Sequence, residues 1–279
     1  IESKKSIRLV KGSHIITKKL YEHNKAFTLQ NPDKRIVFVI PYKKNYSLIG
    51  TTETEVETPD NPEIDKGEID SLDDPVSKYV KEYDTAGKKD ITIRQILNMT
   101  SGLEFPSHEH EMMFFEDDHM EYAFKVGMES EPGEKFQYNN VNSMMIGEIL
   151  KNATGKTAKT LIDERIFSKI NLTNYTAWED SAGNTLTYCC LDMSARDYSK
   201  FGLLFSRDGN WNGEQIISKE YVDESLKLYW GSTPSMGWSH SDTRGYSLQW
   251  WISKYDDQAK IYNTSGKFGQ FVFVDKDRD

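Results

Sequence analysis

The sequence contains no run of about 18 apolar residues, the length that a membrane-spanning helix needs. It has only two cysteines, and these are adjacent at Cys189 and Cys190. A pair of neighbouring cysteines excludes a disulfide framework that would join distant segments. We expect the two side chains to be small, buried and hydrophobic.

Several catalytic motifs are also missing. No serine is followed by a lysine three residues later, so the chain has no Ser-x-x-Lys nucleophile. No Gly-x-Ser-x-Gly is present, and no Gly-x-Gly-x-x-Gly follows a predicted strand. The stretch "SHEHEMMFFEDDHMEY" contains His108, His110 and His119 but no His-Glu-x-x-His. Met112, Met113, Phe114 and Phe115 within this stretch favour an apolar lid or packing face over a metal site.

Charge is distributed unevenly along the chain. Residues 1–50 carry 11 Lys and Arg against 3 Asp and Glu, whereas residues 51–279 carry 24 against 41. The basic residues are interleaved with strand-like runs such as "RIVFVIPY", which argues against a nucleic-acid-binding arm. The repeat within "EIDKGEID" (63–70) lies where the charge changes sign. This asymmetry favours two segments of different origin, 1–65 and 66–279.

The pattern of expected elements changes at the same place. Residues 25–52 hold three β-rich runs separated by turn sequences, which predicts a β-meander. Amphipathic helices follow, among them 142–155 and a helix that opens with the capping pair Ser194 and Asp197. "GYSLQWWI", "AKIYNTSG" and "QFVFVD" then predict closing strands. Helices followed by antiparallel strands indicate an α+β fold with a helical lobe.

Two short motifs bear groups suited to catalysis. A Tyr-x-Asn, Tyr138 with Asn140, follows a Pro-Gly turn and begins a predicted helix. A Lys-x-Gly, Lys267 with Gly269, lies between the last two predicted strands. Taken singly, a tyrosine in such a place is commonly a core residue, and a lysine there is commonly a solvated residue at a strand edge.

Five stretches that follow one another along the chain carry a stronger signal of family membership than either motif alone. They are "IDSLDDPVSKYV", "ITIRQILNMTSGL", "PGEKFQYNNVNSMMIGEILKNATGK", "DMSARDYSKFGLLFSRDGNWNGEQIIS" and "SGKFGQFVFVDKDRD". With them, residues 66–279 resemble the serine β-lactamase and penicillin-binding-protein-like superfamily, in particular the esterases and amide hydrolases similar to 6-aminohexanoate-dimer hydrolase. The resemblance implies an α+β fold with a β-lactamase-like antiparallel sheet and a helical lobe, incomplete at both ends.

The same resemblance implies a role for each motif. Tyr138 would be the base, Asn140 would orient the substrate, and Lys267 would hold substrate charge. The backbone N–H of Gln270, after Gly269, would help to form an oxyanion hole. We expect Tyr138, Asn140 and Lys267 to line one cavity, bordered by the 108–122 lid, with the lysine lowering the pKa of the tyrosine. The substrate would be a small ester or amide, with no cofactor.

Residues 7–62 resemble a second family, the FAD-dependent glycerol-3-phosphate dehydrogenases, in "IRLVKGSHIITKKLYEHNKAFTLQNPDKRIVFVIPY" and "YSLIGTTETEVETPDNPE". The resemblance implies that residues 1–65 are a substrate-side β-sheet, with His14 in a turn and Arg35 near a substrate phosphate. FAD would be a cofactor only under this alternative. By themselves, His14 and Arg35 are a turn histidine and a strand-edge cation.

Together these features predict a β-lactamase-related serine hydrolase that is inactive as it stands, because its nucleophile is absent. Two alternatives remain open: a fragment of a flavin-linked oxidoreductase, and a binding module that keeps the cleft without the chemistry. No nucleic acid and no transmembrane segment are expected. The sequence leaves the acyl substrate, the compartment and the oligomeric state open.

Overall fold

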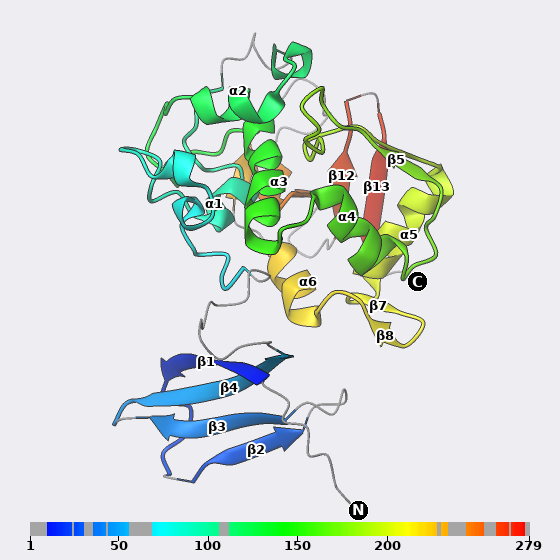
Figure 1. The fold of residues 1–279 in the computed structure, drawn as a ribbon. Helices are drawn as coiled ribbons and strands as arrows, with labels where there is room; N and C mark the ends of the chain where they lie inside the picture. The colour runs from blue at the N-terminus through cyan, green and yellow to red at the C-terminus, as the bar shows by residue number, and fades with distance from the viewer. Residues whose placement is uncertain are drawn as a thin grey trace, which may run out of the picture. The chain divides into compact units, whose positions relative to one another are not determined.

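The computed structural model describes residues 10–23, 25–30, 36–42, 44–55, 69–105, 112–227, 230–233, 244–253, 261–267 and 269–276. The chain divides into two compact units, Ile1–Lys66 and Gly67–Asp279 (Figure 1). No helix in the described part of the chain is long and apolar enough to cross a membrane.

The first unit is a four-stranded antiparallel sheet. Its strands are β1 (Val10–Lys18), β2 (Phe27–Gln30), β3 (Ile36–Tyr42) and β4 (Tyr46–Glu55), in the order β1-β4-β3-β2. In the register of β3 and β4, Ile40 lies opposite Leu48 and Tyr42 opposite Tyr46, which places all four side chains on one face. Phe38 shares that face, and Phe38, Ile40, Tyr42 and Tyr46 are all exposed. One face of this sheet is therefore apolar and uncovered within its own unit.

The second unit contains a helical lobe. Its α-helices are α1 (Ile93–Leu97), α2 (His119–Lys125), α3 (Asn140–Thr154), α4 (Ala158–Ile162), α5 (Ala195–Ser206) and α6 (Lys219–Ser225). Short helical turns span Val76–Lys78, Lys81–Tyr83, Met112–Phe115 and Asp163–Phe167. Met144, Met145 and Ile149 of α3 are fully buried against α1 and α2, so α3 is the central helix of this lobe (Figure 1).

A five-stranded antiparallel sheet completes the second unit. Its strands are β9 (Trp230–Thr233), β10 (Arg244–Ser247), β11 (Trp250–Ser253), β12 (Ile261–Ser265) and β13 (Phe271–Asp275), paired in sequence order. The predicted single strand "GYSLQWWI" is wrong, because Leu248 and Gln249 both have positive φ and form a tight turn between β10 and β11. Two small hairpins pair β5 (Tyr175–Ala177) with β6 (Leu191–Met193) and β7 (Asn210–Trp211) with β8 (Glu214–Gln215).

The helix α5 covers one face of this sheet beside β13 (Figure 1). Gly202 allows the close approach, since a Cβ at this position would lie only 2.6 Å from Cγ1 of Val272. On the strand's other face, Phe271 and Phe273 stack on each other at 5.6 Å and remain exposed. Helices packed beside an antiparallel sheet confirm the predicted α+β fold with its helical lobe.

Candidate active site

The Tyr-x-Asn motif lies at the start of α3, and its middle residue forms the helix N-cap. The Oδ1 atom of Asn139 accepts a hydrogen bond from the Val141 N–H at 2.9 Å. Its Nδ2 atom donates to the carbonyl oxygens of Leu103 at 3.4 Å and Glu104 at 3.1 Å. The buried Asn139 therefore fixes the beginning of α3 to the 103–104 segment. This structural role was not predicted from the sequence.

The side chains on either side of Asn139 differ from it in their hydrogen bonding. Asn140 is the first residue of α3 and is half-buried, and its amide makes no hydrogen bond to another described residue. The hydroxyl of the half-buried Tyr138 likewise makes no hydrogen bond within the described ranges. Both polar groups thus keep their hydrogen-bonding capacity for another molecule.

The ring of Tyr138 is held by an aromatic cluster on the sheet. It stacks on Trp251 of β11, with ring centroids 5.6 Å apart and planes 17° apart. It also meets Tyr246 of β10 edge to face, at 6.2 Å. Phe136 and Met99 complete the apolar surround. These contacts position the phenol between the first turn of α3 and the five-stranded sheet.

This environment changes the acidity of Tyr138 in the direction opposite to our expectation. Burial raises the pKa of the Tyr138 hydroxyl, because desolvation disfavours the phenolate. The expectation that Lys267 lowers this pKa is wrong, and desolvation is the cause of the shift. Burial also raises the pKa of the neighbouring Tyr246. The phenol of Tyr138 is therefore held in its neutral form, as a hydrogen-bond donor, at physiological pH.

The Lys-x-Gly motif lies in a tight turn between β12 and β13. The Gly266 N–H donates to the Gln270 carbonyl at 2.8 Å, and the Gly269 N–H donates to the Gly266 carbonyl at 3.1 Å. Gly269 has a φ of +87°, which favours glycine at this position. Lys267 is exposed in the turn, and Gln270 is exposed beyond it. The turn geometry explains the glycine, while the oxyanion role of the Gln270 N–H stays a prediction.

The two motifs are connected to neighbouring strands of the five-stranded sheet. Tyr138 stacks on Trp251 of β11, and Trp251 pairs with Asn263 of β12. Lys267 follows β12, and β11 and β12 are neighbours in the sheet. The common cavity for Tyr138, Asn140 and Lys267 stays a prediction.

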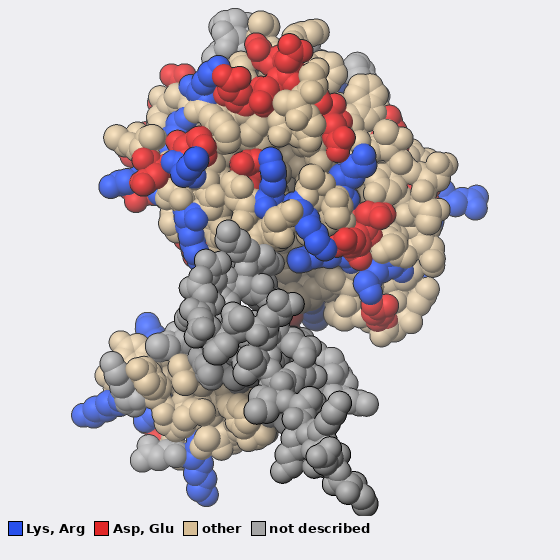
Figure 2. All heavy atoms as spheres, viewed as in Figure 1, with Lys and Arg blue, Asp and Glu red and all other residues tan. Residues whose placement is uncertain are grey.

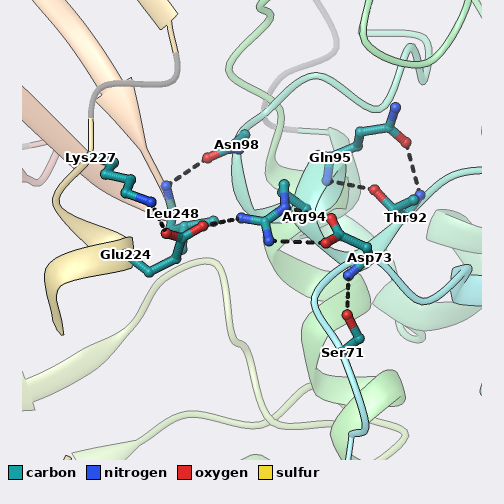
Figure 3. Close-up of polar contacts among 9 residues, drawn as sticks. All are labelled: Ser71, Asp73, Thr92, Arg94, Gln95, Asn98, Glu224, Lys227 and Leu248. Atoms are coloured by element: carbon teal, nitrogen blue, oxygen red, sulfur yellow. Dashed lines mark hydrogen bonds and ion pairs between the residues drawn. The ribbon is translucent and has the colours of Figure 1, made fainter. Parts of the chain in front are cut away.

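A polar network attaches α1 to the sheet and to α6, as Figure 3 shows. Arg94 donates from Nε to Asp73 Oδ1 at 2.6 Å and from Nη1 to Glu224 Oε1 at 2.7 Å. The Arg94 guanidinium lowers the pKa of Asp73 through this hydrogen bond. One turn later, Asn98 Oδ1 accepts from the Leu248 N–H at 2.8 Å. The network therefore anchors the β10–β11 turn, beside the strands that carry Tyr246 and Trp251.

The turn between β10 and β11 also contacts α3 directly. Ser143 donates a hydrogen bond from its hydroxyl to Gln249 Oε1 at 3.1 Å, and the Gln249 N–H donates to the Leu97 carbonyl at 3.1 Å. Nearby, the buried Ser247 Oγ and Asn142 Oδ1 have no hydrogen-bond partner in the described part of the chain. These polar contacts were not predicted from the sequence, because Ser247 and Gln249 flank or form a turn that had been predicted as continuous strand.

The structure corrects the interpretation of the cysteines. Cys189 and Cys190 form a disulfide with each other, and both are half-buried rather than fully buried. Adjacency in the sequence had excluded a framework of distant cross-links, and that conclusion is unaffected. It does not exclude a bond within the pair, because that depends on the backbone conformation. Cys190 has a φ of +69°.

The remaining predicted site residues are only partly described. His14 belongs to β1, where its backbone pairs with Gly50, and so lies in a strand rather than a turn. Arg35, His108 and His110 lie outside the described residues. His119 is buried at the start of α2, with Nδ1 3.1 Å from the Tyr188 hydroxyl. No cluster of three or more potential metal ligands occurs among the residues that are described.

The lid region presents apolar and acidic side chains to solvent. Phe114 and Phe115 are exposed, with ring centroids 6.0 Å apart. Glu116, Asp117 and Glu121 are exposed beside them, and Figure 2 shows acidic side chains gathered over α2. Elsewhere on the visible face of the second unit, positive and negative side chains are interspersed (Figure 2). No broad basic surface appears in this view.

Comparison with known proteins gives two kinds of match. The family model described as Beta-lactamase matches residues 64–279. A candidate 6-aminohexanoate-dimer hydrolase from Bacillus anthracis superposes with a TM-score of 0.62 at 22% identity, covering 75% of this chain and 58% of that one. A family VIII carboxylesterase superposes with a TM-score of 0.61 at 18% identity, covering 74% and 68%. At these identities the superpositions show the fold alone.

The second kind of match is shorter and of higher identity. The aerobic glycerol-3-phosphate dehydrogenase of Escherichia coli (strain K12) is 40% identical over 98 residues, which is 35% of this chain and 18% of that enzyme. This chain therefore spans less than a fifth of the dehydrogenase that it matches, and less than two thirds of the Bacillus anthracis hydrolase chain.

Proposed function

Because this chain belongs to the beta-lactamase family, we propose that residues 64–279 form the substrate-recognition part of a serine hydrolase for small esters or amides. Under this proposal, Asn140 orients the acyl group and Lys267 attracts a negative charge on the substrate. The N–H of Gln270 stabilises the oxyanion. Tyr138 donates a hydrogen bond from its hydroxyl to the substrate.

The observation that carries the proposal is that two polar side chains of the Tyr-x-Asn motif make no hydrogen bond within the described ranges. Asn139 is fully engaged in capping α3, whereas the Tyr138 hydroxyl and the Asn140 amide make no hydrogen bond within the described ranges. Both are half-buried at the N-terminal end of a 15-residue helix. Polar groups in such a position cost stability unless a ligand or solvent engages them, and so they indicate a binding role.

The pKa of Tyr138 restricts its role in the chain as it stands. Because its pKa is raised, the Tyr138 phenol stays protonated at neutral pH, so it is not available as a base and can donate a hydrogen bond. In an acyl-transfer enzyme, a tyrosine can act as base for a neighbouring serine only if a nearby cation favours its phenolate form. Residues 1–279 contain no Ser-x-x-Lys to supply that serine and lysine together. We propose that Tyr138 binds substrate as a donor in this chain, and that the chain does not turn over esters.

Two measurements test the two halves of this proposal. Fluorophosphonate labelling followed by intact-mass analysis should give no adduct, and p-nitrophenyl acetate should hydrolyse close to the background rate. Serine hydrolases without their nucleophile retain at most about 10³–10⁴ of rate enhancement over water, which is the upper limit for the rate expected here. An adduct on any serine would overturn the proposed inactivity.

Recognition is tested separately by binding. Quenching of tryptophan fluorescence by a small N-acyl amide should report the site, because Trp251 stacks on Tyr138. Tyr138→Phe and Asn140→Ala should each weaken binding by about fivefold to tenfold, the equivalent of one hydrogen bond. Asn152→Ala is the matched control, since Asn152 lies on the exposed side of the same helix, bonded to Glu148. Equal affinity in all four proteins would contradict the assigned site.

A second proposal concerns residues 1–65 and rests on the dehydrogenase match. We propose that this sheet derives from the substrate side of an FAD-dependent glycerol-3-phosphate dehydrogenase. The described residues of this unit are four strands without a helix, so they offer no helix N-terminus for the pyrophosphate of FAD. We expect colourless protein whose melting temperature does not respond to FAD. A rise of several degrees at micromolar FAD would contradict this.

A further inference from the structure

The Cys189–Cys190 disulfide lies at the end of the loop that joins β5 to β6, here called the 178–190 loop. Backbone hydrogen bonds close this loop at its base: the Trp178 N–H donates to the Cys190 carbonyl at 3.1 Å, and the Leu186 N–H donates to the Trp178 carbonyl at 2.9 Å. Glu179 and Thr185 form a bridge between the two arms. The disulfide is therefore part of a closed hairpin and not of a free surface segment.

The 178–190 loop holds the N-terminus of α2. The His119 N–H donates to Asp180 Oδ2 at 2.9 Å, and Asn184 Nδ2 donates to Asp118 Oδ1 at 3.1 Å. The Ala182 N–H donates to the Asp117 carbonyl at 3.2 Å. Three contacts thus connect the tip of the loop to the three residues where the lid region enters α2.

The same loop contacts α3 next to the candidate active site. The Thr187 hydroxyl donates to the Ser143 carbonyl at 2.7 Å, within the first two turns of the helix. Its Oγ1 would lie 3.2 Å from a Cβ at Gly147, so the loop packs closely on the helix. Thr187 precedes the disulfide by two residues, and Tyr188 adjoins it.

Tyr188 joins the disulfide segment to α2. Its hydroxyl lies 3.1 Å from Nδ1 of the buried His119, and the two rings are 5.9 Å apart. Tyr188 therefore connects the residue next to the disulfide with the start of α2.

Cys190 has a backbone conformation that residues with a Cβ seldom adopt. Its φ of +69° lies in the left-handed region, where most residues other than glycine are disfavoured. The bond to Cys189 ties this residue to its neighbour. Once that bond is broken, the ordinary backbone preference opposes the left-handed conformation, and the segment can relax.

We propose that Cys189–Cys190 is a thiol–disulfide exchange site for a dithiol reductant, and that its reduction releases the 178–190 loop from α2. Two electrons and two protons pass from the reductant to the pair. The bond between the two Sγ atoms breaks, two thiols form, and the reductant becomes a disulfide. Both cysteines are half-buried, which leaves access for a small thiolate. The chain has no other cysteine, so neither thiol has an alternative partner within it.

Hydrogen exchange measured by mass spectrometry tests the coupling. Oxidised protein is compared with protein treated with dithiothreitol and alkylated with iodoacetamide, so that the mass reports both thiols. We expect amides of residues 119–125 and 184–190 to exchange about tenfold faster after reduction, with α5 unchanged as the internal control. Full alkylation without faster exchange in 119–125 would overturn the coupling. Thiols that are free even after treatment with an oxidised dithiol would overturn the exchange site.

Two variants separate the disulfide from the contact that transmits its effect. The Cys189→Ser/Cys190→Ser double variant should exchange like reduced protein and give no response to dithiothreitol. Tyr188→Phe keeps the ring but removes the hydroxyl that meets His119. In this variant, reduction should accelerate the hydrogen exchange of residues 119–125 less than it does in wild type. The acceleration in residues 184–190 should be unchanged. If reduction accelerates the exchange of residues 119–125 as much as in wild type, the role of Tyr188 is contradicted. If a variant fails to fold, the comparison of oxidised and reduced wild-type protein still tests the proposal.

Discussion

The phenol ring of Tyr138 lies almost parallel to the indole ring of Trp251, with 17° between their planes and 5.6 Å between their centroids. One residue belongs to the loop that begins α3, and the other to the centre of the five-stranded sheet. The stack therefore joins the helical lobe to the sheet at the candidate active site. It also desolvates the phenol, which determines how Tyr138 titrates.

We predict that Tyr138 ionises above the usual range of a tyrosine in the folded protein. Burial raises its pKa from 10.0, so above pH 10 the folded state binds more protons than the unfolded state. Stability is therefore lost as pH rises through the folded-state pKa. In an ultraviolet titration, Tyr138→Phe should remove one late-titrating tyrosine, and its alkaline loss of stability should be less steep. Loss of an early-titrating tyrosine instead would contradict the desolvated environment.

The two asparagines of the Tyr-x-Asn motif provide a matched pair. Asn139→Ala removes the cap of α3 and leaves the carbonyls of Leu103 and Glu104 without their donor. We expect a loss of about 2 kcal/mol in the free energy of unfolding by urea denaturation. Asn140→Ala should change it by less than about 0.5 kcal/mol, because its amide has no described partner. The reverse order would show that the cap has been assigned to the wrong residue.

Arg94 should contribute to stability in a pH-dependent way. Its guanidinium contacts Asp73 and Glu224, but Asp73 is 65% exposed, so solvent screens that pair. We expect Arg94→Ala to lower the free energy of unfolding by about 1–2 kcal/mol at neutral pH.

The acid dependence of this effect follows from the lowered pKa of Asp73. The stabilisation by the Arg94 pair is fully present above pH 3.8, the ordinary value, and disappears as pH falls through the lower folded-state pKa. The difference in the free energy of unfolding between wild type and Arg94→Ala should therefore become smaller in acid. Lys156→Ala is the control: its pair with Glu164 is 49% exposed on both sides, so about 0.5 kcal/mol or less is expected. An acid-independent difference would indicate that Arg94 acts through packing alone.

Gly269 should tolerate a side chain poorly for reasons of backbone conformation and not of space. Nothing lies within 4 Å of a Cβ built there, but its φ is +87°. We expect Gly269→Ala to cost about 1–2 kcal/mol in thermal denaturation. Gly269→Asn should cost less, because asparagine adopts the left-handed region more readily. Equal costs for the two variants would mean that the turn has rearranged.

Much of the fold could be predicted from local sequence. The expected helix over 142–155 is α3, and Gly155 ends it with a φ of +73°. The expected capping pair is present too, since Ser194 Oγ accepts from the Asp197 N–H at 3.2 Å at the start of α5. Caps and helical periodicity depend on neighbours a few residues away, which is why they can be recognised without the tertiary structure.

Local patterns were misleading at two places where segments distant in the sequence meet. The stretch "ITIRQILNMTSGL" has apolar residues at helical spacing, but its helix is only Ile93–Leu97, since Met99 adopts a φ of +59° and is buried in the aromatic cluster around Tyr138. The strand "GYSLQWWI" is interrupted at Leu248, whose N–H bonds to Asn98 of another segment. In both places tertiary packing overrides the local pattern.

The sequence alone determined the family resemblance, the α+β class and the absence of a Ser-x-x-Lys, because each of these is a matter of residue order. Only the tertiary structure decided that the phenol of Tyr138 is desolvated, that Asn139 and not Asn140 caps α3, and that Cys189 bonds to Cys190. Acidity, capping and cross-linking depend on which atoms meet in space and how much water remains around them. Chain segments far apart in the sequence supply those atoms, so local sequence patterns do not reveal them.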